Sequence, residues 1–146
     1  MKALGWNCRG ICYTSTVRAL RAHLKGHHLE IIILSETKAN EDHMEKVRKS
    51  IGFTNMKVIS SNGKAVGLCM MWTNSVKVNV IEFDDHIIAI EIIDGVCNWV
   101  LVGFYGTPYA VKRKAVWENL SAFLESVKGP WACFGDFNVA ISDEEK

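Results

Sequence analysis

The feature that most constrains the fold is a short run of branched apolar residues at 31–34, IIIL, which ends in the polar pair Ser35-Glu36. A short run without polar alternation is typical of a strand that is covered on both faces. Another apolar stretch lies at residues 4–6, and between the two stretches apolar residues recur at helical spacing. Strand, helix and strand in this order predict an α/β crossover near the N-terminus.

Turn signals divide the rest of the chain into further elements. Ser15 and Asn40 are the predicted N-caps of two helices that end at Gly26 and Gly52, and a third helix is predicted over residues 111–127. Predicted strands cover residues 56–59, 67–72, 77–83, 86–93, 99–105 and 131–134. The simplest arrangement of the first five is a meander. No repeat or linker interrupts the chain, so we expect one α/β domain over residues 1–146.

Composition excludes several classes of protein. The sequence is 49% apolar and 23% charged, which argues against disorder and against a coiled coil. No apolar stretch approaches the length that crosses a bilayer, and the N-terminus is too short and polar for a signal peptide. We therefore expect a soluble intracellular protein without a membrane partner. A net charge of +1 says almost nothing about other partners.

Four polar residues share one setting, because each follows an apolar strand. They are Asn7, Glu36, Tyr105 and Asp136. Each has a simpler interpretation by itself: a turn residue, a solvated acid, an aromatic packed over a turn, and an Asx turn. Ligand and catalytic groups gather at strand ends in α/β sheets, however, and four residues in the same setting favour a shared site.

The chemistry of these residues suits a phosphate ester. Mg²⁺ prefers oxygen ligands and is often held by one or two carboxylates, a pattern that Glu36 with Asn7 would satisfy. Asp136 could orient or deprotonate a water for attack on phosphorus. The amide of Asn138 and the hydroxyl of Tyr105 could donate to the phosphate oxygens as negative charge develops.

Four ordered blocks give the chain a specific resemblance. WNCRG at 6–10, LSETK at 34–38, FYGTP at 104–108 and GDFN at 135–138 resemble, in order and spacing, the endonuclease/exonuclease/phosphatase superfamily. The sequences of these blocks are most similar to those of the endonuclease domain of plant-type LINE retrotransposons, which are relatives of the abasic-site endonucleases. The resemblance implies a four-layer α/β sandwich, in which two mixed sheets pack face to face with helices outside.

The resemblance also implies a role for each residue. Asn7 and Glu36 match the metal site, for Mg²⁺ or for Mn²⁺ in its place. Tyr105 matches a tyrosine that contacts the scissile phosphate, Asp136 the acid that activates the nucleophile, and Asn138 the amide that steadies the phosphate.

Partners follow from the same resemblance. Arg113 is a weaker match to a basic residue near the DNA backbone. DNA is then the expected substrate, a reverse transcriptase the expected fusion partner in the parent element, and the nucleus an expected location.

The chain departs from the family at its C-terminal side. The family's domain is usually longer and contributes a late Ser-Asp-His block, whereas Ser142-Asp143 is followed here by Glu144. All five histidines precede GDFN, and His86 lies in a predicted hairpin turn away from the pattern. We therefore expect a truncated domain, the N-terminal part of the sandwich without its C-terminal half, that is inactive or weak alone.

Two alternatives remain open at this point. The same fold could act on a phosphate ester other than DNA, as a phosphodiesterase or phosphatase. The chain could also be a domesticated binding module that contacts a protein or a nucleic acid without catalysis. The similarity of WNCRG and LSETK to LINE sequences favours the endonuclease over the first alternative.

Overall fold

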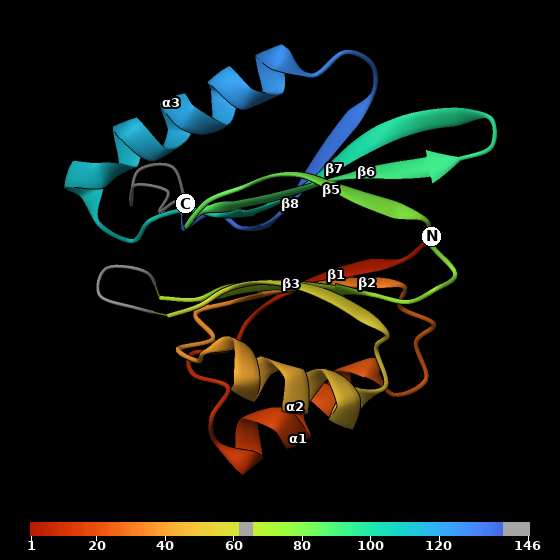
Figure 1. The fold of residues 1–146 in the computed structure, drawn as a ribbon. Coiled ribbons are helices and arrows are strands. Elements are labelled where there is room, and N and C mark those ends of the chain that lie inside the picture. The colour runs from red at the N-terminus through yellow and green to blue at the C-terminus, as the bar shows by residue number, and fades with distance from the viewer. Residues whose placement is uncertain (62–65, 139–146) are drawn as a thin grey trace, which may run out of the picture.

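The computed structural model describes residues 1–61 and 66–138, so the predicted Ser142-Asp143 pair lies outside the described residues. Two four-stranded mixed sheets lie face to face, and helices cover the outer face of each sheet (Figure 1). The layers run from α1 and α2 through the two sheets to α3 (Figure 1). This arrangement confirms the predicted α/β sandwich.

The first sheet contains the N-terminal crossover. Its strand order is β1 (Ala3–Asn7), β2 (Ile31–Ser35), β4 (Leu68–Trp72) and β3 (Asn55–Ile59), with β1 parallel to β2 and the other pairs antiparallel. Helix α1 (Thr14–Leu24) connects β1 to β2, and α2 (Glu41–Ile51) follows β2. Every residue of β2 is buried, as its run of branched apolar residues predicted.

The two N-terminal helices begin differently. Asn40 caps α2 as predicted, because its Oδ1 accepts the His43 backbone N–H at 2.9 Å. The predicted cap of α1 is wrong, since that helix begins at Thr14 and has no side-chain cap. The Tyr13 carbonyl already accepts the N–H groups of Thr16 and Val17, at 3.0 and 3.2 Å, so the first turn starts before Ser15.

The second sheet is formed by the later part of the chain. Its strand order is β5 (Val78–Phe83), β6 (Ile87–Asp94), β7 (Cys97–Tyr105) and β8 (Trp131–Asp136). β5, β6 and β7 are antiparallel neighbours, whereas β8 is parallel to β7 and is reached through α3 (Ala110–Ser126).

The predicted five-strand meander is therefore correct for the β3–β4 pair and for β5 to β7, and wrong at the step from β4 to β5. All five residues of β4 are buried, and this strand pairs with β2 on one side and with β3 on the other. A strand buried on both faces gains most at the centre of a covered sheet. The chain therefore changes sheets between β4 and β5.

Apolar side chains fill each space between layers. One cluster lies between the first sheet and its two helices, and another lies between the second sheet and α3. The middle cluster joins the two sheets and includes Ile33, Met70, Ile88 and Ile90. Three stacked clusters hold the sheets in a fixed relation, which is what aligns residues that the sequence keeps far apart.

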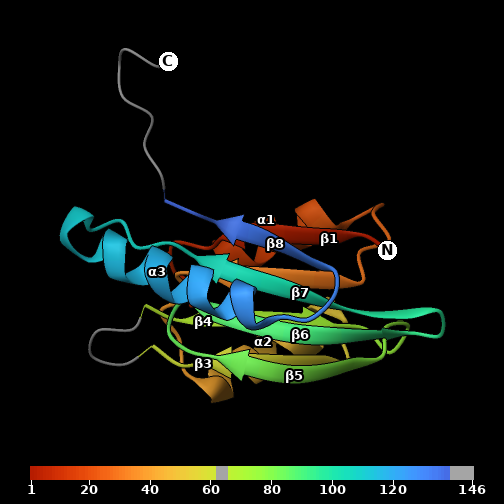
Figure 2. The ribbon, with the colours of Figure 1, turned by 90° about the horizontal axis from the view of Figure 1, so that it is seen from above.

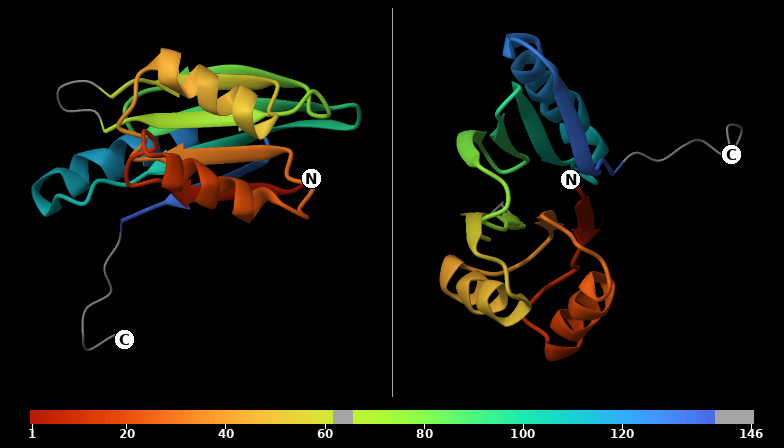
Figure 3. Two further views of the ribbon diagram at one scale, coloured as in Figure 1. Left: turned by 90° about the horizontal axis from the view of Figure 1, so that it is seen from below. Right: turned by 90° about the vertical axis from the view of Figure 1, so that its right-hand side faces the viewer.

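One strand of each sheet meets the other at close range. β1 and β8 lie side by side although they belong to different sheets (Figures 2 and 3). A Cβ atom added to Gly5 of β1 would lie 3.2 Å from the Cα of Gly135 in β8. Two glycines at the contact therefore allow a backbone approach that larger residues would prevent.

Candidate active site

The four predicted strand-end residues lie at the carboxyl ends of two parallel strand pairs. Asn7 is the last residue of β1, and Glu36 directly follows its partner β2. Tyr105 and Asp136 are the last residues of β7 and β8, and they face each other in the register. Because β1 packs against β8, the two pairs meet at one end of the sandwich.

Hydrogen bonds connect these residues into one cluster. The Nδ2 of Asn7 donates to Glu36 Oε2 and to Asp136 Oδ2, at 2.8 Å in each case. The Tyr105 hydroxyl donates to the same Glu36 Oε2 at 2.9 Å. Carboxylates from the two sheets thus converge on a single amide nitrogen, although residues 7 and 136 are far apart in the chain.

Asp136 uses its two oxygens for different purposes. Oδ1 accepts the backbone N–H of Asn138 at 3.0 Å, which is an Asx turn. Oδ2 faces Asn7 and the cluster. The side-chain nitrogen of Asn138, Nδ2, donates to the Gly106 carbonyl. This hydrogen bond joins the GDFN turn to the segment after β7. One oxygen of Asp136 therefore forms the Asx turn, and the other faces the cluster.

Strained backbone is concentrated in the loops at this end. The non-glycine residues with positive φ in the described chain are Arg9 (50°), Glu36 (50°), Lys38 (52°) and Asn138 (51°). All of them follow β1, β2 or β8. Left-handed conformations cost about 1–3 kcal/mol at functional sites and persist where the surroundings hold them. The fold holds the Glu36 carboxylate in place through such a conformation.

Burial sets the protonation state of Tyr105, which is only 2% exposed. Burial raises the pKa of its hydroxyl well above the ordinary value, and the hydrogen bond to Glu36 raises it further. The residue is a neutral hydrogen-bond donor at physiological pH. Burial, together with the Glu36 charge, also raises the pKa of the neighbouring Cys8 to about 12, so this thiol is not a nucleophile.

A cleft of about 680 Å³ opens beside the cluster and is called the reaction cleft here. It is lined by Asn7, Arg9, Glu36, Pro108, Arg113, Gly135, Asp136, Phe137 and Asn138. The Nε of Arg113 is buried and has no hydrogen-bond partner within residues 1–61 and 66–138. Arg113 and Arg9 supply the positive charge of this cleft, beside the carboxylates of Glu36 and Asp136.

His86 lies closer to the site than the sequence predicted. It lines a cleft of about 340 Å³ together with Glu36 and Tyr105. Its Nδ1 donates to the Tyr105 carbonyl at 2.7 Å, so this hydrogen bond does not use Nε2. The rings of His86 and Tyr105 are parallel, and their centroids lie 6.1 Å apart. The register of β6 and β7 places Ile87 opposite Phe104, so residue 86 falls beside residue 105.

The donor set fits a divalent cation through its carboxylates. The carboxylates of Glu36 and Asp136 converge on the position of Asn7 Nδ2. A hard cation at this position would replace the positive end of the Asn7 amide dipole. Asn7 turns Nδ2 toward the two carboxylates, because its Oδ1 accepts the Arg9 N–H at 3.0 Å. No group of three or more His, Cys, Asp or Glu side chains arranged for a metal occurs in the described part of the chain. Two carboxylates that converge on one position are a donor set of the kind that, with water, often holds a hard divalent cation.

Comparison with known proteins gives this geometry a context. The sequence pattern of the Endonuclease/Exonuclease/phosphatase family matches residues 4–145. The chain belongs to this family. Among curated proteins, no sequence matches the chain.

Solved structures of several other proteins share the fold. The endonuclease domain of TRAS1, a telomere-specific non-LTR retrotransposon, is 14% identical with a TM-score of 0.59, over 95% of this chain and 59% of that one. An AP endonuclease from Archaeoglobus fulgidus is 18% identical with a TM-score of 0.68, over 97% and 58%. The APE2 catalytic domain of Xenopus laevis is 18% identical with a TM-score of 0.64, over 95% and 59%. The chain thus spans less than two thirds of the length of these structures.

Membrane-spanning helices are a separate question. Within the described residues, none of the helices combines the length and the apolar character that crossing a bilayer requires.

Proposed function

We propose that this chain carries the reaction centre of a Mg²⁺-dependent endonuclease that hydrolyses DNA phosphodiesters, of the LINE retrotransposon type. The observation that carries the proposal is the sharing of the Asn7 amide by Glu36 and Asp136, with Tyr105 bonded to Glu36. The likeness to the retrotransposon and AP endonuclease structures supports the choice of DNA. The resemblance to LINE elements also leads us to propose a fused reverse transcriptase and a nuclear site of action.

Each residue has a role in the proposed reaction. Asp136 accepts the proton of the attacking water through Oδ2, while the Asn138 N–H holds Oδ1. The Arg113 guanidinium donates to oxygens of the scissile phosphate. The Tyr105 hydroxyl, which donates to Glu36 in this structure, would turn to a phosphate oxygen once a cation occupied Glu36 Oε2. Glu36 would hold the cation with Asn7 beside it, and a bound Mg²⁺ would stabilise the negative charge that develops on the phosphate.

The rate of the isolated chain should be low. We propose that residues 1–146 act as one domain, and no histidine follows GDFN within them. A general acid or base is typically worth 10²- to 10⁴-fold in rate. Residues 1–146 assayed by themselves should therefore cleave slowly, and a sensitive assay is required.

Plasmid nicking tests the proposal. The wild type should convert supercoiled plasmid to the open circular form in Mg²⁺ and not in EDTA. Glu36→Gln and Asp136→Asn preserve shape while removing charge, and each should reduce nicking about 100-fold or more. Glu125→Gln, at an exposed position on α3, is the matched control and should nick at the wild-type rate.

The alternatives predict other results. Salt-sensitive DNA binding without nicking by the wild type, even at high enzyme concentration, would favour a binding module. Hydrolysis of a small phosphodiester with no action on plasmid would favour a phosphodiesterase for another substrate. Nicking that persists in both Glu36→Gln and Asp136→Asn would show that a contaminant or another site is responsible.

A further inference from the structure

Helices α1 and α2 lie side by side on the outer face of the first sheet (Figure 3). Residues of both helices line a groove with a volume of about 320 Å³, and its basic lining residues are Arg18, Arg21, His43 and Lys46. None of its lining residues, all of which are described, is acidic. We call it the helix groove. A cleft lined by charge of one sign concentrates the electrostatic field and attracts the opposite charge.

Three permanent cations line the helix groove. In the described part of the chain, Arg18, Arg21 and Lys46 are not among the cations within 4.0 Å of a carboxylate. All three side chains are exposed, and an anion bound between them would be attracted by each of them. The arrangement therefore points to a ligand with negative charge.

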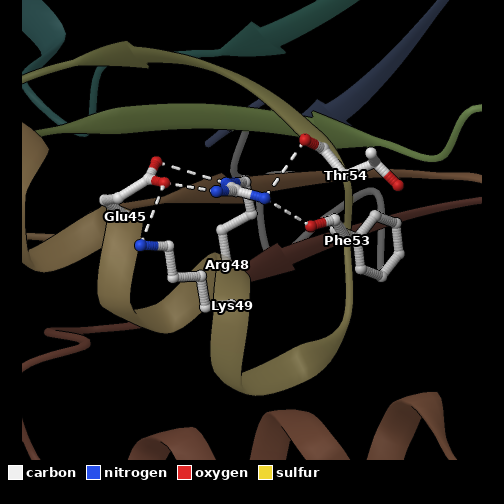
Figure 4. A network of polar contacts seen from close by, with 5 residues as sticks. All are labelled: Glu45, Arg48, Lys49, Phe53 and Thr54. Atoms are coloured by element: carbon white, nitrogen blue, oxygen red, sulfur yellow. Dashed lines mark hydrogen bonds and ion pairs between the residues drawn. The ribbon is translucent and has the colours of Figure 1, made fainter.

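The other cations of α2 are arranged in the opposite way (Figure 4). Arg48 is paired with Glu45 and donates to the carbonyl groups of Phe53 and Thr54, at 2.8 and 3.1 Å. Lys49 lies 3.9 Å from the same carboxylate. Unpaired charge is thus not a general property of this helix, and on α2 it belongs to the side that faces α1.

One cation of the helix groove is held by hydrogen bonds, and one loop contributes residues both to the groove and to the reaction cleft. Arg21 extends from α1 to the end of α2, where it donates to the hydroxyl and the carbonyl oxygen of Ser50. At its other end the groove is lined by Cys12, which belongs to the loop after β1. The same loop carries Arg9, which lines the reaction cleft.

We propose that the helix groove binds backbone phosphates of a nucleic-acid strand whose scissile phosphate occupies the reaction cleft. This inference rests on the proposed DNA substrate. Arginine and lysine side chains that neutralise successive phosphates are the usual source of affinity for a nucleic acid.

Salt-dependent binding tests the inference without any cleavage. The probe is a fluorescein-labelled single-stranded oligonucleotide in EDTA, titrated between about 50 and 200 mM salt. Arg18→Gln/Lys46→Gln should bind about tenfold more weakly and reduce the slope of log K against log salt by about 1.4, which is 0.7 for each lost contact. The control Lys25→Gln/Lys49→Gln removes the same net charge from exposed positions outside the groove. It should retain most of the wild-type slope.

The outcomes separate this inference from the proposed function. Equal losses in the groove variant and in the control would overturn the inference, because net charge alone would then explain binding. A wild type that fails to nick DNA but binds it through the groove would overturn only the proposed function. A wild type that nicks, with a groove variant that binds normally, would overturn only the inference.

Cysteine protection locates the strand independently. Cys12 lines the helix groove and Cys97 lies at the start of β7, and both thiols are free and exposed. Bound oligonucleotide should slow alkylation of Cys12 and leave Cys97 unchanged. Arg18→Gln/Lys46→Gln should abolish the protection of Cys12. Protection by inorganic pyrophosphate as strong as that by the oligonucleotide would overturn the assignment to a strand.

Discussion

At the scale of residues, Asn7 is the group that makes the cluster possible. Two carboxylates from different sheets would repel each other if nothing positive lay between them, and the Asn7 amide supplies two hydrogen bonds of 2.8 Å to them. Tyr105 adds a third, from a hydroxyl that burial keeps protonated. The cluster is therefore stable without a cation and presents its charge to one.

Replacing Asn7 should separate the stability of the cluster without a cation from its stability with one. Asn7→Ala should lower the free energy of unfolding by about 2–3 kcal/mol in EDTA, because hydrogen bonds to charged groups are lost and the carboxylates repel. Mg²⁺ should restore more stability to the variant than to the wild type, since the cation replaces the amide between the carboxylates. Urea unfolding with and without Mg²⁺ measures both effects. A loss no larger than that of Asn79→Ala, at an exposed position of β5, would contradict this account.

At the scale of elements, the contact between β1 and β8 aligns the two halves of the site. The strands belong to different sheets, and a glycine on each side allows their backbones to approach. Gly135 also has a φ of 134°, and a Cβ atom on it would lie 2.1 Å from the Phe104 carbonyl oxygen. The glycine of GDFN is therefore required by the fold as well as by the turn.

Alanine substitutions should show a graded effect at this contact. Gly135→Ala should destabilise the protein by about 4 kcal/mol or more, because it meets backbone in a conformation that side chains rarely adopt. Gly5→Ala should cost about 1 kcal/mol but reduce plasmid nicking at least tenfold, since it moves Asn7 away from Asp136. Gly95→Ala has open space around its Cβ and is the control. Equal effects of Gly5→Ala and Gly95→Ala would show that the strand contact is not tight.

At the scale of the whole molecule, the layered core encloses thiols that must stay protonated. Cys8 and Cys69 are 5% and 0% exposed, and burial raises the pKa of each thiol above its ordinary value. The unfolded chain ionises near the ordinary value of 9.0 while the folded chain does not. The contribution of these protonated thiols to stability is thus fully present below about pH 9 and is lost as the pH rises toward the folded pKa.

Alkaline unfolding measures this loss. Above about pH 9 the free energy of unfolding should fall by about 1.4 kcal/mol per pH unit for each buried thiol. Cys69→Ala should make the decline shallower, whatever it does to stability at neutral pH. Met71→Leu, also buried in β4, should alter stability without altering the slope. A parallel decline in the wild type and in Cys69→Ala would show that this thiol is not the source.

Local chemistry explains what the sequence predicted correctly. The apolar run before Glu36 is a covered strand because branched side chains favour that setting, and Asn40 caps α2 through its own side chain. The ends of the strands could also be predicted from local chemistry, because the side chains change from apolar to polar where burial stops. Asn7, Glu36, Tyr105 and Asp136 could therefore be selected from the sequence, and so could the family.

The tertiary structure decided which of these ends meet and how. Whether β4 pairs with β2 or continues a meander depends on the burial of both its faces, which involves strands far apart in the chain. The orientation of the Asn7 amide, and the contact of His86 with Tyr105, depend on sheet register. The sequence by itself determined the elements and the polar residues that end them, because propensity and polarity are local. Only the packing of one sheet against the other could place those residues within hydrogen-bond distance, because that distance is set by contacts from every layer.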